Sequence, residues 1–141
     1  MAVRTAEAEW KGDLREGTGT FRTGSGALEG SYSFGSRFEE SKGSNPEELI
    51  GAALAGCYSM ALSKALSDAG GTPGSIRTKA RVHLEKGDGG FSVTRIDLET
   101  RVTASGVDEA TFQEKALATK SGCPVSRALR VEIALDAKLE G

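Results

Sequence analysis

Apolar and polar residues alternate in several stretches of this 141-residue chain, the pattern expected of half-buried strands. Three short alternating segments lie in the first forty-odd residues, which are rich in glycine and serine: Ala6–Trp10, Thr18–Phe21 and Ala27–Phe34. We interpret them as a small antiparallel sheet. Further on, Thr78–Lys86 and Phe91–Ala104 alternate on either side of a Gly87-Asp88-Gly89-Gly90 turn, which predicts a β-hairpin.

The second strand of this hairpin changes phase along its length. Phe91 and Val93 follow one alternation, whereas Ile96, Leu98 and Val102 follow the other. If one face is buried throughout, a bulge must lie near Thr94-Arg95, and the sheet should be strongly curved.

A long helix is predicted from Pro46 to about Ala69. Asn45 suits the N-cap, proline suits the first helical position, and Glu48 lies where a capping box places its acid. The uncharged stretch Leu49–Ser63 falls short of the roughly 20 apolar residues that span a bilayer, so we expect a buried helix.

The C-terminal third predicts two more helices and a strand. Asp108 caps a helix that runs to about Lys120, Gly122-Cys123-Pro124 interrupts it, and a short helix follows. Val131, Ile133 and Leu135 alternate as a last strand. The fold class is therefore α+β, and we expect a single domain over residues 1–141.

Composition narrows the class of partner. The 18 basic and 20 acidic residues give a net charge of −2, and no long run of one sign occurs. The sequence therefore lacks the basic patch of proteins that bind nucleic acid or an anionic membrane. We expect its partner to be a small molecule or a protein. Met1–Glu7 lacks the apolar stretch of a signal peptide, so we expect a cytoplasmic protein.

The chain has only two cysteines, Cys57 and Cys123. Cys57 lies among small and apolar residues, where a buried inert thiol is the plain alternative. Cys123 precedes Pro124 at the start of a short helix, so its sulfur should face free backbone N–H groups, which favour a thiolate. Helix capping alone could also explain that Cys-Pro pair.

In a reducing cytoplasm, a disulfide between the two cysteines is more plausibly transient and catalytic than structural. If their Cα atoms lie within about 4.4–6.8 Å, one sulfur can form a sulfenic acid that the other resolves. Their distance in the sequence does not establish this.

Other chemistries fit worse. Two isolated cysteines and one histidine, His83, do not supply the ligand set of a structural zinc site. We expect His83 at a sheet surface, and nothing in the sequence places it beside a thiol as a hydrolase would require. No G-x-S-x-G elbow or Walker loop occurs.

Three segments carry a family resemblance: Asn45–Ile50, Cys57–Leu62 and Ser121–Ser126. They closely resemble the OsmC branch of the OsmC/Ohr family of organic hydroperoxide reductases. Ser36–Glu39 resembles the arginine segment of that family, and Ala8–Gly12 resembles its opening strand. The resemblance covers nearly the whole chain.

The resemblance implies a thiol peroxidase in which Cys57 attacks the peroxide, Cys123 resolves, Arg37 stabilises the thiolate and Glu47 positions Arg37. It implies strongly curved antiparallel sheets around a long buried central helix, in an intertwined homodimer with active sites at the interface. It implies no metal and no bound cofactor. An external dithiol, by resemblance a lipoyl group on a protein, would reopen the disulfide.

Helix geometry adds a constraint on Glu47 and Cys57. On one helix, ten residues correspond to about 15 Å along the axis. For Glu47 and Cys57 to belong to one site, either the helix must be broken near Gly51, or Glu47 must come from a symmetry-related chain. We favour the second alternative, because small residues on this helix allow a second helix to approach closely.

We therefore expect a stress-defence enzyme that reduces organic hydroperoxides to alcohols, and H2O2 less well. One alternative is a non-catalytic stress or binding module whose cysteines sense oxidation. Another is a protein disulfide oxidoreductase, which the missing C-x-x-C motif and the expected burial of Cys57 disfavour.

Overall fold

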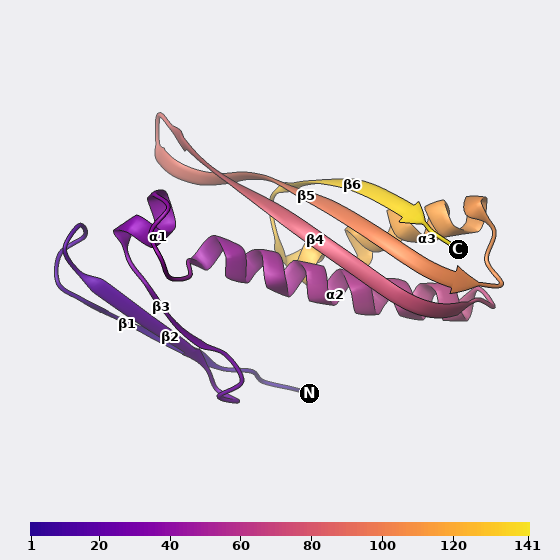
Figure 1. Cartoon of the computed structure of the whole chain (residues 1–141), viewed down its shortest axis with the longest axis horizontal. Helices are drawn as coiled ribbons and strands as arrows, with labels where there is room; N and C mark the ends of the chain where they lie inside the picture. The colour runs from indigo at the N-terminus through magenta and orange to yellow at the C-terminus, as the bar shows by residue number, and fades with distance from the viewer. The chain divides into compact units, whose positions relative to one another are not determined.

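The computed structural model describes residues 1–141, which pack as two compact units, Met1–Leu49 and Ile50–Gly141. The predicted α+β class is confirmed, while the single domain stays a prediction. The elements (Figure 1) are β1 (Ala6–Lys11), β2 (Thr18–Thr23), β3 (Glu29–Tyr32), α1 (Phe34–Phe38), α2 (Pro46–Asp68), β4 (Thr72–Gly87), β5 (Gly90–Ser105), α3 (Glu109–Gly122), α4 (Pro124–Ala128) and β6 (Glu132–Leu139).

The first unit contains the predicted three-stranded antiparallel sheet, in the order β1-β2-β3. Its third strand is shorter than predicted, because the chain turns into helix α1 after Ser33. Ser33 and Ser36 bond each other's backbone N–H groups, at 3.1 and 2.8 Å, which forms a reciprocal capping box. Helix α1, which was not predicted, carries Arg37.

One face of this small sheet is aromatic. The ring of Tyr32 lies between Trp10 and Phe21, with centroid distances of 5.4 and 5.7 Å. Gly19 lies directly beneath, where a Cβ atom would come within 2.5 Å of the Tyr32 ring. This position therefore requires glycine, because any side chain would displace the aromatic cluster.

The second unit contains the predicted hairpin, strands β4 and β5, with its bulge confirmed. His83 pairs with Arg95 and Leu84 with Val93, so Thr94 is the extra residue. Figure 1 shows both strands twisting along their length. A further register shift between Pro73 and Ser75 was not predicted.

Strand β6 pairs with β5 in parallel, so the expectation of purely antiparallel sheets is wrong for this sheet. The physical reason is the connection. Helices α3 and α4 lie between the two strands in the chain and provide the long crossover that a parallel pair needs.

Helix α2 begins and ends within one residue of its predicted bounds. The side chain of Asn45 caps it by accepting from the Glu48 N–H at 2.8 Å. The Glu48 carboxylate accepts from the Ser44 hydroxyl at 2.9 Å. Four fully buried residues recur at four-residue spacing on one side of the helix: Leu54, Tyr58, Leu62 and Leu66. They form one core with residues of β5 and α3.

The opposite side of α2 is open in the single chain. Ala52 and Gly56 are exposed, and the Met60 side chain is 80% exposed. By length and composition alone α2 could cross a membrane, a property that it shares with core helices of soluble proteins. The expectation of a buried helix thus holds on one side only. Gly51 does not belong to the open side, because it lies against Val82 of β4.

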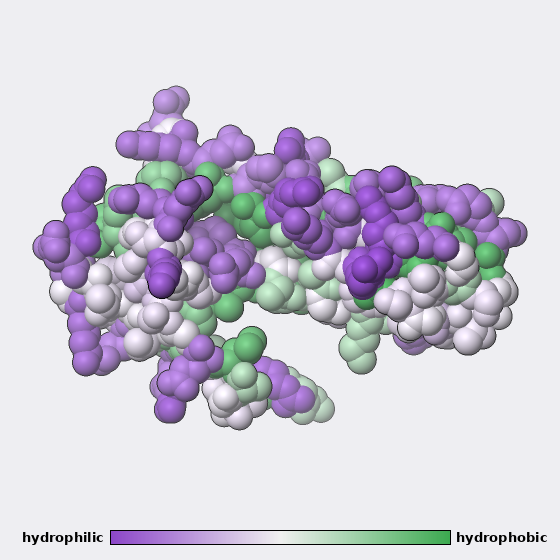
Figure 2. Space-filling view, in the orientation of Figure 1, coloured by the Kyte–Doolittle hydropathy of each residue, from purple (hydrophilic) through white to green (hydrophobic).

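Hydrophilic side chains cover β4 and β5 in the view of Figure 2. On this hairpin, His83 is bonded to the Asp97 carboxylate at 2.8 Å, and Arg95 reaches the same carboxylate at 2.9 Å. The hydrogen bond from His83, helped by Arg95, holds the pKa of Asp97 below its ordinary value. The histidine lies at a sheet surface, as expected.

Truncating the core under α2 should destabilise the protein strongly. Leu62 is fully buried, so Leu62→Ala should lower the free energy of unfolding by about 2–5 kcal/mol through lost burial and a residual cavity. Leu117→Ala, on the exposed side of α3, is the control and should change it by less than about 0.5 kcal/mol. Denaturant unfolding measures both, and equal effects would contradict this assignment of the core.

Candidate active site

The two cysteines, far apart in the sequence, come together within the second unit. Cys57 lies in the middle of α2, and Cys123 lies at the junction of α3 and α4. Both are free thiols, and they lie close enough that each shifts the pKa of the other. Cys57 is partly exposed, whereas Cys123 is 1% exposed.

Cys123 is held at a helix start. It ends α3, and Pro124 opens α4 directly after it. Its thiol donates to the Ser126 hydroxyl at 3.3 Å, and that hydroxyl donates to the Cys123 carbonyl at 2.8 Å. Once Cys123 is a thiolate, the same hydroxyl can turn to donate to the sulfur. Burial would raise the pKa of Cys123, but hydrogen bonds from Ser126, Cys57 and the Val125 N–H together lower it below the ordinary value.

The pKa of Cys57 moves in the opposite direction. Burial, as the largest cause, raises it, and the adjacent Cys123 raises it further against the effect of the Val125 N–H. Within the single chain, negative charge is therefore favoured on Cys123 rather than on Cys57. A thiolate at Cys57 requires an additional cation.

Tyr58 is a fully buried neighbour that our sequence analysis did not single out. Its hydroxyl donates to the Ala116 carbonyl at 2.9 Å, which ties α2 to α3 beside the cysteines. Burial and the charge of Cys123 raise its pKa well above the ordinary value, so it stays a neutral donor. The only sequence signal was its position next to Cys57.

The first unit brings Arg37 and Glu47 together. The Nε and Nη2 atoms of Arg37 donate to Oε1 of Glu47 at 3.0 and 2.8 Å. Glu47 is buried, and its other oxygen, Oε2, has no hydrogen-bond partner. A carboxylate at this depth fixes the guanidinium by a charge-assisted pair.

Arg37 also borders an apolar cavity of about 250 Å³ within the first unit. The cavity is lined by Trp10, Leu14, Tyr32, Ser33, Phe34, Arg37 and Phe38. The guanidinium lies over the Phe38 ring, 5.2 Å from its centroid. A cation beside an aromatic wall can bind a molecule that has one polar end and one apolar end.

Helix α2 runs without interruption past Gly51, so the alternative of a broken helix is wrong. Glu47 and Cys57 thus lie ten residues apart on one continuous helix, about 15 Å along its axis. Arg37 is bonded to Glu47 rather than to a sulfur. The symmetry-related chain remains as the predicted source of a cation for Cys57.

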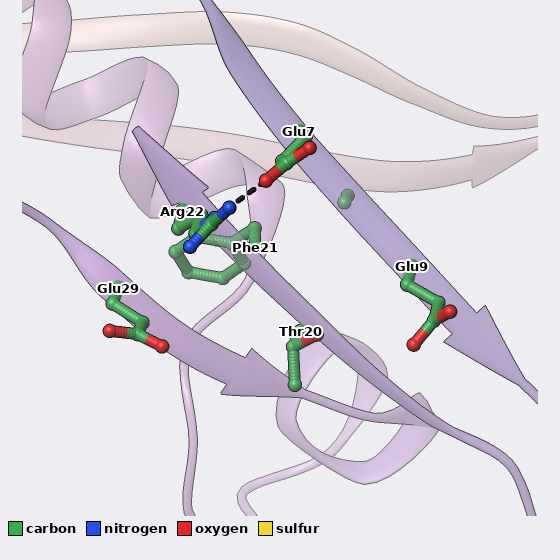
Figure 3. Close-up of a pocket in the computed structure, with 7 residues that line it drawn as sticks. Glu7, Glu9, Thr20, Phe21, Arg22 and Glu29 are labelled. Atoms are coloured by element: carbon green, nitrogen blue, oxygen red, sulfur yellow. Dashed lines mark hydrogen bonds and ion pairs between the residues drawn. The ribbon is translucent and has the colours of Figure 1, made fainter. Parts of the chain in front are cut away.

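Two further cavities lie elsewhere. Figure 3 shows one of about 430 Å³ on the first sheet, where Arg22 bonds Glu7 and where Glu9 and Glu29 add negative charge. It holds no thiol. The other, of about 350 Å³, runs between α2 and α3 and ends at Cys123. No group of three or more His, Cys, Asp or Glu side chains is placed to hold a metal ion.

The Ser126 hydroxyl should control ionisation of the pair. We expect Ser126→Ala to raise the pH at which the first thiolate forms in the reduced protein, because Cys123 loses the hydroxyl that lowers its pKa. Thiolate absorbance near 240 nm, followed against pH, measures this. Ser121→Ala, an exposed change nearby, is the control and should leave the midpoint in place. An unmoved midpoint in Ser126→Ala would contradict the assigned hydrogen bonds.

Comparison with known proteins gives one consistent family. Residues 39–138 match the family model described as OsmC-like protein. Peroxiredoxin OsmC of Escherichia coli K12 is 50% identical over 138 residues, which cover 97% of this chain and 96% of the relative. An organic hydroperoxide resistance protein of Xanthomonas axonopodis pv. citri is 32% identical over 92 residues, 64% of this chain and 63% of the relative.

A solved structure supports the same grouping. The crystal structure of the organic hydroperoxide resistance protein OhrB of Bacillus subtilis matches with a TM-score of 0.70 and 26% identity. The match covers 95% of this chain and 98% of that one. The architecture described above is thus that of solved relatives.

Proposed function

Because this chain belongs to the OsmC/Ohr family of thiol peroxidases, we propose that it reduces organic hydroperoxides to alcohols, with Cys57 as the attacking sulfur and Cys123 as the resolving one. The observation that carries the proposal is the pairing of the only two thiols of the chain in one partly buried site. Paired thiols of this kind allow oxidation to be reversed by disulfide formation.

The reaction has two balanced steps. The Cys57 thiolate attacks one oxygen of the hydroperoxide, the O–O bond breaks, and the alkoxide takes up a proton to leave as the alcohol. Cys57 is then a sulfenic acid. The Cys123 thiolate attacks this sulfur and expels hydroxide, which leaves as water after protonation and gives a Cys57–Cys123 disulfide.

Arg37 is proposed to act on Cys57 across a two-fold axis. A raised pKa for Cys57 in the single chain calls for a cation, and Glu47 holds the guanidinium of Arg37 in a fixed plane. An isologous dimer, with α2 helices crossing antiparallel, would bring Arg37 of the partner subunit to Cys57. The exposed apolar side of α2 and the aromatic face of the first sheet are the surfaces that such a dimer would cover.

The preference for organic hydroperoxides over H2O2 follows from the apolar cavity beside Arg37. Its aromatic walls would hold the organic group of the substrate while the guanidinium hydrogen-bonds the departing alkoxide. H2O2 has no group that would fill this cavity. No metal or bound cofactor takes part in the proposed cycle.

An external dithiol is proposed to reopen the disulfide, and a lipoyl group carried by a protein has the required chemistry. Transient disulfides fit a reducing compartment, so the cytoplasm is the proposed location and defence against oxidative or osmotic stress the proposed role.

Steady-state consumption of cumene hydroperoxide and of H2O2, with dihydrolipoamide as reductant, tests the proposal. We expect repeated turnover and a higher kcat/KM for the organic peroxide. If about one peroxide is consumed per chain, whatever dithiol is supplied, the protein is not a peroxidase but a redox-sensing stress module. Reduction of a model protein disulfide would instead favour a disulfide oxidoreductase.

A further inference from the structure

We propose that the reductant attacks the Cys57 sulfur of the Cys57–Cys123 disulfide and that Cys123 is the leaving thiolate. This inference rests on the proposed peroxidase cycle, and it states which sulfur is attacked in the step that returns the disulfide to two thiols. The two sulfurs of a disulfide are chemically alike, so their surroundings decide which one is attacked.

Access separates the two sulfurs. The whole of Cys123 is 1% exposed, although a cavity between α2 and α3 ends at this residue. Cys57 is partly exposed on α2. Cys57 is thus the more exposed cysteine of the single chain. The proposed cycle also requires a hydroperoxide to reach the Cys57 sulfur, and a reductant thiolate can use the same approach.

The surroundings of the leaving group act in the same direction. When the S–S bond breaks, the electron pair stays on the Cys123 sulfur. This sulfur lies 3.3 Å from the Ser126 hydroxyl at the start of α4, and this setting lowers the pKa of the Cys123 thiol. A thiol with a lower pKa leaves faster. Cys57 has the higher pKa of the two and would be the poorer leaving group.

The step balances without a further reactant. A reductant thiolate forms a bond to the Cys57 sulfur, and the Cys57–Cys123 bond breaks to give the Cys123 thiolate. With a dithiol, the second thiolate then attacks the reductant's own sulfur and releases the Cys57 thiolate. The reductant gives up two electrons and ends as a disulfide, and both cysteines are reduced.

Adduct mapping on the unaltered protein tests this directly. The disulfide is first formed with diamide, so that no hydroperoxide chemistry is needed. A short pulse of glutathione, a monothiol, then opens it, free thiols are blocked at once with N-ethylmaleimide, and the peptides are analysed by mass spectrometry. Pulses of decreasing length, extrapolated to zero time, remove any later transfer between the sulfurs.

We expect glutathione on Cys57 and maleimide on Cys123, in at least about tenfold excess over the reverse pattern. Glutathione mainly on Cys123 would overturn the inference and would assign the cavity between α2 and α3 as the path of the reductant. An equal mixture, or no Cys57–Cys123 disulfide after diamide, would also overturn it. If glutathione maps to Cys57 while no hydroperoxide is turned over, the inference stands and the proposed function fails.

Ser126→Ala supplies an independent rate measurement. We expect slower reduction of the diamide-formed disulfide by glutathione, since the Cys123 thiolate loses the hydroxyl that stabilises it. Ser121→Ala should reduce at the unaltered rate. A Ser126→Ala disulfide that opens as fast as the unaltered one would contradict departure of Cys123.

Discussion

Cys57→Ser should abolish hydroperoxide turnover, with a loss of at least about a thousandfold, because serine at this position supplies no nucleophile of comparable strength at neutral pH. Cys123→Ser should behave differently. It keeps the attacking sulfur, so one equivalent of hydroperoxide should be consumed rapidly, after which Cys57 remains a sulfenic acid and turnover stops. A stopped-flow assay of cumene hydroperoxide, with a sulfenic-acid trap, distinguishes the two variants.

The same assay also shows whether the two cysteines have the opposite roles. In the single chain it is Cys123, not Cys57, whose pKa is lowered. If the rapid phase survives in Cys57→Ser and vanishes in Cys123→Ser, the attacking and resolving roles are exchanged. A rapid phase that persists in both variants would remove both cysteines from the first step. Ser59→Ala, two residues from Cys57 on α2, removes a hydroxyl that bonds Thr78 and not a thiol, so it is the matched control and should turn over normally.

Arg37→Ala should lower kcat/KM for an organic hydroperoxide by about 10²–10³, the usual effect of removing one group that stabilises developing negative charge. The pH profile should also move to higher pH, because the pKa of Cys57 is raised by burial and would lose its cation. Arg37→Lys should recover part of the activity, as it restores the charge without the planar fork. Arg77→Ala, which removes an exposed guanidinium on β4, is the control and should leave kcat/KM unchanged.

Mixing two inactive variants tests whether Arg37 acts across the dimer. When Arg37→Ala and Cys57→Ser chains exchange subunits, half of the dimers carry one of each. If Arg37 serves the partner subunit, one site in each mixed dimer is intact, and activity should return to about a quarter of the unaltered value. If Arg37 acts within its own chain, every site lacks either Arg37 or Cys57, and no activity should be recovered. A gel-filtration profile with no dimer would contradict the arrangement altogether.

Local chemistry explains which elements were predictable. Asn45 and Pro46 determine the start of α2, and Asp108 caps α3 by accepting from the Thr111 N–H at 2.7 Å. The change of phase between Val93 and Ile96 predicted a bulge near Thr94-Arg95, and the structure places it at Thr94. In each case a few neighbouring residues carry the whole signal.

Other features depend on contacts that no local pattern encodes. The parallel pairing of β6 follows from the path of α3 and α4, and alternation of Val131, Ile133 and Leu135 is the same for either strand direction. Helix α1 is only five residues long, and its Ser33–Ser36 capping box is a weak signal within a serine-rich stretch.

The candidate site also combines features that the local sequence predicts with features that depend on the fold. The helix-start setting of Cys123 could be predicted, because Pro124 follows it directly. The pairing of Cys57 with Cys123 could not, since it depends on how α2 packs against the end of α3. Burial of Glu47, which makes its bond to Arg37 strong, is likewise a property of the folded unit and not of the sequence around it.

Mass spectrometry of the reduced protein after one equivalent of cumene hydroperoxide tests the central claim most directly. The proposed cycle predicts one cumyl alcohol per chain and a protein lighter by two hydrogen atoms, with the peptides of Cys57 and Cys123 joined within one chain. An unchanged mass with the hydroperoxide intact would contradict it, as would sulfinic acid on one cysteine with the other still a free thiol.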